Sequence, residues 1–189
     1  RLRPFRNYHY LTELSDKTVG ILGAGNIGGQ IAKRLEAFDM HVLGYDLHTD
    51  DRPHFEKIYN ETHLQEFLGR CDYLVNCMPL FKSTEGMLCK KWFDLMKSTV
   101  TIVNVGRKKI INDKDFIAFL KSHKDATAVL DMFEKVPNPL TNPYRRLSNV
   151  LVLPGVTAIS REIDKKLSVL IGENMKRLQS GEPLLNQIV

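Results

Sequence analysis

The chain has 189 residues, of which 43% are hydrophobic and 26% charged, and its formal net charge is +5. This length is enough for one large domain, or a domain with an appendage, around a buried core. The lysines and arginines are scattered in pairs, so they indicate solvated surface and exclude the basic stripe of a nucleic-acid-binding face. We find no signal peptide and no apolar run long enough to span a bilayer, so we expect a cytoplasmic protein without a membrane partner.

The first predicted element is a buried strand over residues 18–22, followed by a G-x-G-x-x-G turn. Gly23 allows the tight turn, Gly25 lets the backbone approach a pyrophosphate, and Gly28 lets the helix and strand pack closely. The helix starts at Asn26 or Ile27 and offers unpaired N–H groups to phosphates. The alternative interpretation is a glycine turn that binds no ligand.

A second apolar run over residues 41–45 ends at Asp46, eighteen residues after Gly28. An acidic residue at this point accepts hydrogen bonds from a ribose diol and repels a 2′-phosphate. We therefore predict that the cofactor is NAD and not NADP.

Helices and strands continue to alternate along the chain. After the polar loop predicted over 47–62, we predict strands over 73–77, 100–104, 126–130 and 150–153. Helices are predicted over 63–68, 89–96, 113–120 and 161–180. Asp113 is expected to cap the helix over 113–120, and Gly181 to end the helix over 161–180. This order indicates an α/β fold, a Rossmann-type doubly wound parallel sheet in three layers, over residues 1–189.

Ligands of such sheets bind beyond the carboxyl ends of the strands. This rule selects Gly25–Ile27, Asp46, Met78–Pro79, Val105–Arg107, Asp131–Phe133 and Pro154–Val156. Arg107 could clamp a substrate carboxylate with two hydrogen bonds, or be a surface arginine in a basic run. Asp131 could hold a carboxamide donor, or cap a turn.

The three cysteines and six histidines do not form a metal-binding pattern. The spacing of Cys71, Cys77 and Cys89 fits no zinc motif, and their odd number argues against a disulfide framework. We expect free thiols and no metal.

Several motifs resemble, in order, those of the NAD-binding domain of the D-isomer-specific 2-hydroxyacid dehydrogenases. They are residues 13–21, Pro79-Leu80 with Thr84, Asn104-Val105-Gly106-Arg107, Leu130-Asp131-Met132-Phe133-Glu134 and Gly181-Glu182-Pro183-Leu184-Leu185-Asn186. The resemblance implies hydride transfer between NAD and a small 2-hydroxy or 2-keto acid, with Arg107 orienting the acid. It also implies a homodimer. The cofactor-binding residues expected from the motifs and the strand ends together are Gly23, Gly25, Asn26, Ile27, Gly28, Asp46, Met78, Pro79, Thr84, Val105, Gly106, Asp131 and Gly155.

The chain departs from the family at the proton-transfer pair. Val136 stands at the position of the family's glutamate and Gly155 at that of its histidine. Lys108 or Lys109 could replace the acid only with strong desolvation. Two functions remain open: a dehydrogenase domain with impaired turnover, and a non-catalytic NAD(H)-binding module that acts as a sensor or dimerisation scaffold.

The resemblance also implies a substrate domain that the given sequence has no room for. Residues 161–189 are then a helix and tail that pack toward that domain. Whether the chain is a piece of a longer protein, and which substrate it has, are not readable from these residues.

Overall fold

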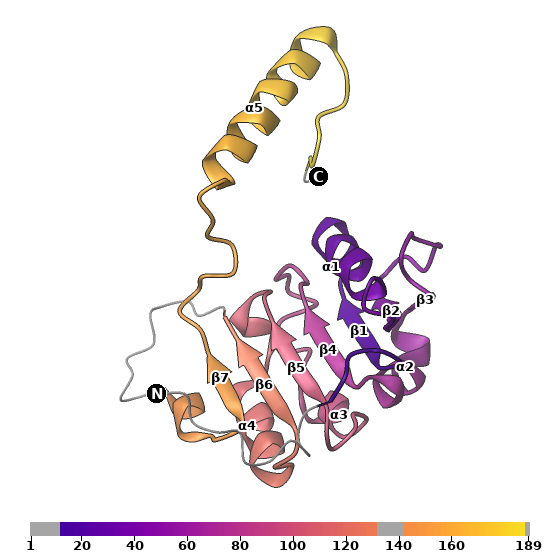
Figure 1. Ribbon diagram of the computed structural model, residues 1–189, viewed down its shortest axis with the longest axis vertical. Helices are drawn as coiled ribbons and strands as arrows, with labels where there is room; N and C mark the ends of the chain where they lie inside the picture. Colours follow the sequence, from indigo (N-terminus) through magenta and orange to yellow (C-terminus); the bar gives the residue numbers. More distant parts are fainter. Residues whose placement is uncertain (1–11, 132–141, 188–189) are drawn as a thin grey trace. The chain divides into compact units, whose positions relative to one another are not determined.

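The computed structural model of the chain describes residues 12–131 and 142–187 (Figure 1). In chain order, its elements are β1 (Thr18–Leu22), α1 (Asn26–Glu36), β2 (His41–Tyr45), β3 (Lys57–Tyr59), η2 (Glu61–His63), α2 (Leu64–Arg70), β4 (Tyr73–Asn76), α3 (Lys90–Phe93), β5 (Thr101–Asn104), η3 (Lys108–Ile110), α4 (Asp113–Ser122), β6 (Thr127–Leu130), η4 (Pro143–Arg146), β7 (Val150–Val152) and α5 (Ile163–Ser180).

The strands form one parallel sheet in the order β3-β2-β1-β4-β5-β6-β7. The order reverses between β1 and β4, and at such a switch point the loops after neighbouring strands diverge and leave a crevice. The predicted doubly wound α/β fold is therefore confirmed.

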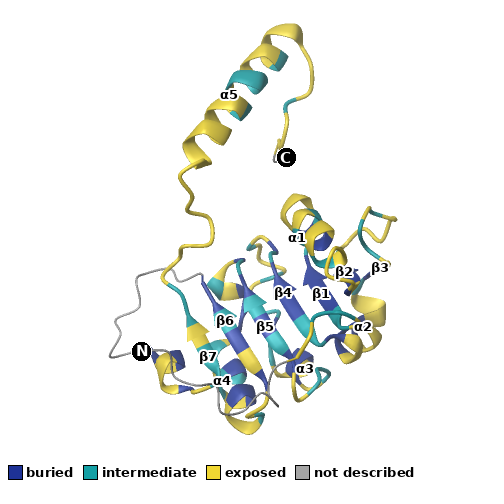
Figure 2. Cartoon of the chain, in the orientation of Figure 1, coloured by how far each residue is buried: buried dark blue, intermediate teal, exposed yellow. Residues whose placement is uncertain are grey.

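Two apolar cores lie on opposite faces of the sheet, because side chains alternate along each strand. On one face, α2, α3 and α4 pack on residues such as Leu22, Leu74 and Ile102. On the other, α1 covers β1 and β2, where Val19 and Ile21 are completely buried. Figure 2 shows this burial concentrated in the strands and in the helix faces turned toward them.

Three predicted elements are wrong in detail. The polar segment 47–62, which the sequence predicts to be loop throughout, contains β3 and η2. The helix expected over 89–96 is confined to Lys90–Phe93. The cap of α4 is Asn112, whose side chain accepts a hydrogen bond from the N–H of Asp115, and not Asp113, which is the first residue of the helix.

Residues from 156 onward form a second unit, which we describe by itself. Its helix α5 ends, as predicted, at Gly181, which has a left-handed φ of 71°. The tail then turns back, because the side-chain amide of Asn174 exchanges two hydrogen bonds with the backbone of Leu185. None of the residues of α5 is buried.

Candidate functional site

The glycine turn between β1 and α1 has the backbone geometry that its spacing predicts. Gly23 has a positive φ of 89°, and a Cβ at Gly28 would lie 2.0 Å from the carbonyl oxygen of Gly23. A Cβ at Gly25 would meet nothing within 4 Å, so the backbone there is open to a ligand. Asn26 and Ile27 form the exposed first turn of α1. The turn therefore offers a cradle that fits a pyrophosphate.

Asp46 lies beside this turn, at the carboxyl end of β2. Its Oδ2 accepts a hydrogen bond from the N–H of Ala24 at 2.9 Å and another from Nη1 of Arg52 at 3.2 Å. The same Nη1 donates to the carbonyl of Ala24 at 2.8 Å. Sequence reasoning missed Arg52, because it assigned the segment to an unstructured polar loop.

The loops after β4 and β5 are joined by two buried asparagines that sequence reasoning did not select. Nδ2 of Asn76 donates to Oδ1 of Asn104 at 2.8 Å. Oδ1 of Asn76 accepts from the N–H of Met78, and Oδ1 of Asn104 accepts from that of Gly106. The N–H of Val105 donates to the carbonyl of Asn76. One feature could have revealed this pair: Asn76 and Asn104 are the same residue type and stand opposite each other in the register of β4 and β5.

These loops also contact the glycine turn. A Cβ at Gly23 would lie 3.3 Å from the Cα of Met78, and a Cβ at Gly106 would lie 3.0 Å from the carbonyl oxygen of Met78. The structure therefore brings three of the predicted cofactor-binding segments together at one end of the sheet.

Thr84 holds its own loop together. Its hydroxyl donates to the carbonyl of Pro79 at 2.9 Å and accepts from the N–H of Phe81 at 2.8 Å. Thr84 thus has a structural role in shaping the loop after β4, and a contact of Thr84 or Pro79 with cofactor stays a prediction.

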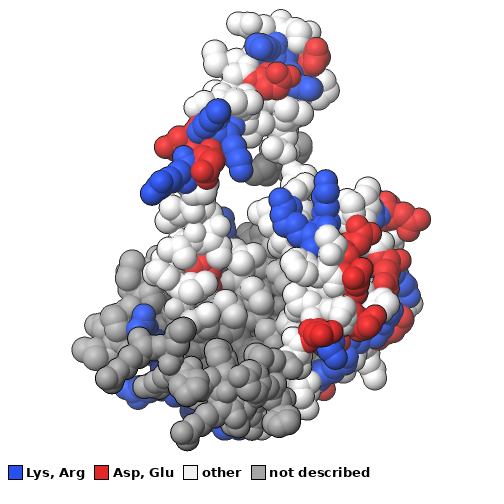
Figure 3. Space-filling model, viewed as in Figure 1, with Lys and Arg blue, Asp and Glu red and all other residues white. Residues whose placement is uncertain are grey.

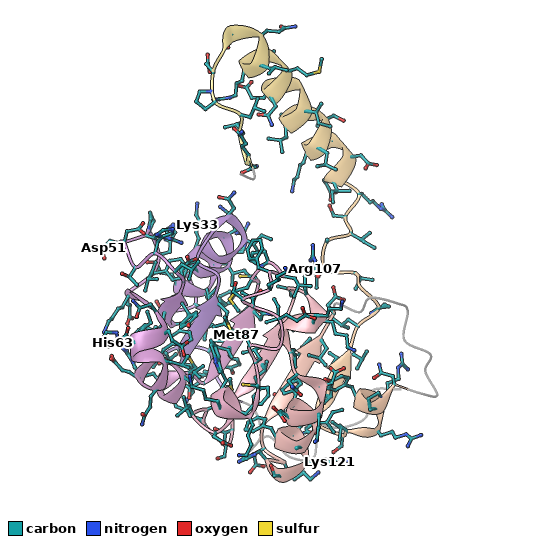
Figure 4. The ribbon with its side chains drawn as sticks, turned by 180° about the vertical axis from the view of Figure 1, so that it is seen from behind. Lys33, Asp51, His63, Met87, Arg107 and Lys121 are labelled. Carbon is teal, nitrogen blue, oxygen red and sulfur yellow. The ribbon has the colours of Figure 1, made fainter. Side chains whose placement is uncertain are left out.

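Arg107 follows Gly106 at the end of β5 and is exposed. Figure 4 shows it at the end of the sheet opposite to Lys121, which is in the last turn of α4. Its neighbour Lys108 is paired with Asp113 at 2.7 Å. The carboxylate of Asp113 therefore lies directly against the ammonium group of Lys108.

Asp131 and Gly155 meet at the ends of β6 and β7. The N–H of Gly155 donates to Oδ1 of the buried Asp131 at 3.0 Å. Gly155 has a φ of 79°, a conformation that L side chains rarely adopt. The position that the resemblance assigns to a histidine is therefore one where a histidine would be strained. The other position of the pair, Val136, and residues 132–133 lie outside the described residues.

Cys77 lies under the glycine turn, where its thiol donates to the carbonyls of Leu22 and Gly23. Burial, with a smaller contribution from the nearby charge of Asp46, raises the pKa of this thiol to about 12. Cys77 is therefore protonated at neutral pH and is not a nucleophile. Within residues 12–131 and 142–187, no group of three or more His, Cys, Asp or Glu side chains could hold a metal ion, and no helix there is long and apolar enough to cross a membrane.

Comparison with known proteins agrees with this arrangement. Residues 4–156 match the family model for the NAD-binding domain of D-isomer specific 2-hydroxyacid dehydrogenases. The chain is 31% identical to D-3-phosphoglycerate dehydrogenase of Archaeoglobus fulgidus, over 93% of this chain and 33% of that protein. It is 33% identical to glyoxylate reductase of Korarchaeum cryptofilum, over 92% of this chain and 53% of that protein. It thus spans a third to about half of the length of these relatives.

A similar fold occurs in the crystal structure of a D-isomer specific 2-hydroxyacid dehydrogenase from Xanthobacter autotrophicus in complex with NADPH and MES. The TM-score is 0.85 and the sequence identity 29%, covering 96% of this chain and 75% of that one.

Proposed function

The chain belongs to the D-isomer specific 2-hydroxyacid dehydrogenase family through its NAD-binding domain, and on that premise we propose that the carboxyl end of its sheet binds NAD(H) beside a small 2-hydroxy or 2-keto acid. The observation that carries the proposal is the cradle of Gly23, Gly25 and Gly28 with Asp46 at its edge. The cofactor supplies or accepts the hydride when it is bound.

Each proposed residue has a distinct role. The open backbone at Gly25 and the N-terminus of α1 take the pyrophosphate. Asp46, fixed by the N–H of Ala24, accepts from the adenosine ribose. Arg107 holds the carboxylate of the organic acid with two hydrogen bonds, which its exposed guanidinium is shaped to do.

A second candidate function is a non-catalytic NAD(H)-binding module. The specific observation that favours it is the left-handed backbone of Gly155, which disfavours a histidine at the position of the family's general acid. Loss of general acid–base catalysis costs roughly 10²- to 10⁴-fold in rate. We therefore propose that hydride transfer is at most weak unless another group supplies the proton.

Two further proposals concern the rest of the molecule. Residues 161–189 would pack toward a substrate domain. Apolar side chains that α5 leaves exposed, among them Leu167, Ile171 and Met175, support this.

We also propose that the protein is a homodimer and that it resides in the cytoplasm. The free cysteines support the second proposal, because they fit a reducing compartment.

Titration of NADH fluorescence tests the binding proposal. The chain is expected to bind NADH, and Asp46→Ala to weaken binding roughly tenfold to a hundredfold, because charge-assisted hydrogen bonds to the ribose are lost. Unchanged affinity in Asp46→Ala would remove Asp46 from the site, and no binding by the unmodified chain would refute the proposal.

Oxidation of NADH with a panel of small 2-keto acids separates the two candidate functions. The non-catalytic module predicts no oxidation by the full-length protein. Turnover that is lost in Arg107→Ala, but kept in the matched control Arg145→Ala on the distant η4, would instead establish an active dehydrogenase.

A further inference from the structure

Two buried asparagines, Asn76 and Asn104, join the ends of β4 and β5 side chain to side chain. Their exposed fractions are 0% and 2%, and Nδ2 of Asn76 donates to Oδ1 of Asn104 at 2.8 Å. A buried amide without a partner is costly, so each of these side chains holds the other in place. The bridge therefore fixes the two strand ends relative to each other.

The backbone on either side of the bridge is held by the same two residues. Oδ1 of Asn76 accepts from the N–H of Met78 at 3.2 Å, and Oδ1 of Asn104 accepts from the N–H of Gly106 at 3.1 Å. The carbonyl of Asn76 accepts from the N–H groups of Val105 and Gly106, at 3.0 Å and 2.9 Å. A Cβ at Gly106 would lie only 3.0 Å from Nδ2 of Asn76. The loop after β5 is thus packed tightly against the end of β4.

The loop is also anchored on the far side of Arg107. The N–H of Gly86 donates to the carbonyl of Lys109 at 2.8 Å, and that of Leu88 to the carbonyl of Ile110 at 3.0 Å. Arg107 itself is exposed, and within the described part of the chain its guanidinium has no hydrogen bond or ion pair. The position of its side chain is therefore set by the backbone that carries it and by no contact of its own.

The charge distribution on the visible surface does not replace such a placed residue. Figure 3 shows acidic and basic side chains mixed over the surface around α1, β2 and β3. Mixed charges of this kind give no broad positive field that would gather an anion. Recognition of a small acid then depends on where a single guanidinium is held.

From these contacts we propose that Asn104, bridged to Asn76, is a positioning residue that holds Arg107 where it meets the carboxylate of the organic acid. The inference rests on the proposed function of Arg107 as the residue that binds this carboxylate. Met78 connects the bridge to the cofactor side, because a Cβ at Gly23 would lie 3.3 Å from its Cα. A contact of two parallel hydrogen bonds requires both groups to be aligned, so a small shift of the backbone weakens it.

Two titrations of the full chain test this proposal. Fluorescence measures the affinity for NADH, and calorimetry at saturating NADH measures the affinity for oxamate, an unreactive analogue of a small 2-keto acid. Asn104→Leu removes the bridge with a side chain of similar shape, while the N–H of Gly106 keeps the carbonyl of Asn76 as its acceptor. We expect the oxamate affinity to fall roughly fivefold to twentyfold and the NADH affinity by less than about threefold.

A double-mutant cycle with Arg107 separates positioning from a general loss of structure. Arg107→Ala should weaken oxamate binding roughly tenfold to a hundredfold. In that background, Asn104→Leu should cost no more than about a further twofold, because the group that it positions is gone. An effect independent of Arg107 would instead add its full factor.

A second variant and a control complete the experiment. Asn104→Ser introduces a hydroxyl that can still accept from the N–H two residues further on but is too short to reach Asn76. It should also weaken oxamate binding. Asn149→Leu is the matched control, because Nδ2 of Asn149 donates to three backbone carbonyls within residues 120–126, at the opposite end of the sheet. In the folded control protein, both affinities should stay unchanged.

The outcomes distinguish this inference from the proposed function. Unchanged oxamate affinity in Asn104→Leu and Asn104→Ser would overturn the inference alone, as would an equal loss of both ligands or full additivity with Arg107→Ala. Oxamate binding that does not depend on Arg107 would refute the proposed role of that residue, and the inference with it. Absence of NADH binding by the unmodified chain would refute the proposed function itself.

Discussion

At the scale of single residues, the glycine turn depends on one close approach. Gly28 lies where α1 passes over the carbonyl oxygen of Gly23, and the atom a Cβ would meet there belongs to the backbone. A backbone atom held by the neighbouring strand cannot move aside as a flexible side chain can. Only a residue without a Cβ therefore allows the helix to begin so near the end of β1.

We predict that Gly28→Ala destabilises the chain by about 1–3 kcal/mol, because the added methyl group forces α1 away from the turn. Gly29→Ala is the matched control on the same helix, where a Cβ would meet nothing within 4 Å. Alanine there should stabilise the helix by roughly 0.5–1 kcal/mol. Urea denaturation measures both changes, and a Gly28→Ala protein as stable as Gly29→Ala would contradict the close approach.

At the scale of elements, Asp72 ties together the beginnings of neighbouring strands. Its Oδ2 accepts from the backbone N–H of Thr18 at 2.9 Å, and its Oδ1 accepts from Nζ of Lys97 at 2.8 Å. Burial alone would raise the pKa of Asp72, but these two hydrogen bonds, together with the positive charges of Lys97 and Lys17, outweigh it and hold the pKa below its ordinary value. The folded state is thus stabilised by the charged carboxylate.

We predict that Asp72→Asn lowers the free energy of unfolding at pH 7 by about 1–2 kcal/mol. Because the folded pKa is depressed, this contribution is complete above the unfolded pKa of about 3.9 and is lost as the pH falls through the folded value. The difference between the two proteins should therefore shrink progressively as the pH falls from about 3.9 through the folded pKa. Urea denaturation over a series of pH values from 7 into this acid range checks this; a difference that does not shrink in acid, or one as large in the exposed control Asp125→Asn, would contradict it.

The order of strands and helices was predictable because the apolar strands and glycine turn carry local signals. The strand β3 was not, because Lys57–Tyr59 is three residues long and is defined by its pairing with β2, a contact distant in sequence. Asn112 was missed as a cap in favour of the neighbouring Asp113, since either side chain can accept a backbone hydrogen bond.

The candidate cofactor site, like the fold, was predictable only where its residues follow a local rule. Gly23, Gly28 and Asp46 follow from a spacing rule, and the structure places them together. Arg52 and the buried pair Asn76–Asn104 follow from no local rule, because their partners are set by how loops from different strands meet.

At the scale of the whole molecule, the first unit contains both apolar cores and every described residue of the proposed site. The second unit begins at residue 156, and its helix α5 buries none of its residues. Removing the second unit therefore takes no side chain out of either core.

We predict that a chain ending at Gly155 folds and binds NADH with an affinity within about threefold of that of the full chain. Its free energy of unfolding should change by no more than about 0.5 kcal/mol, because every residue of both apolar cores is retained. Fluorescence titration and urea denaturation of the two chains measure these quantities. Asp46→Ala in the shortened chain serves as the control, and it should lose affinity by the same factor as in the full chain, because its partners Ala24 and Arg52 are retained. A shortened chain that folds but no longer binds NADH would mean that residues after 155 contribute directly to the cofactor site.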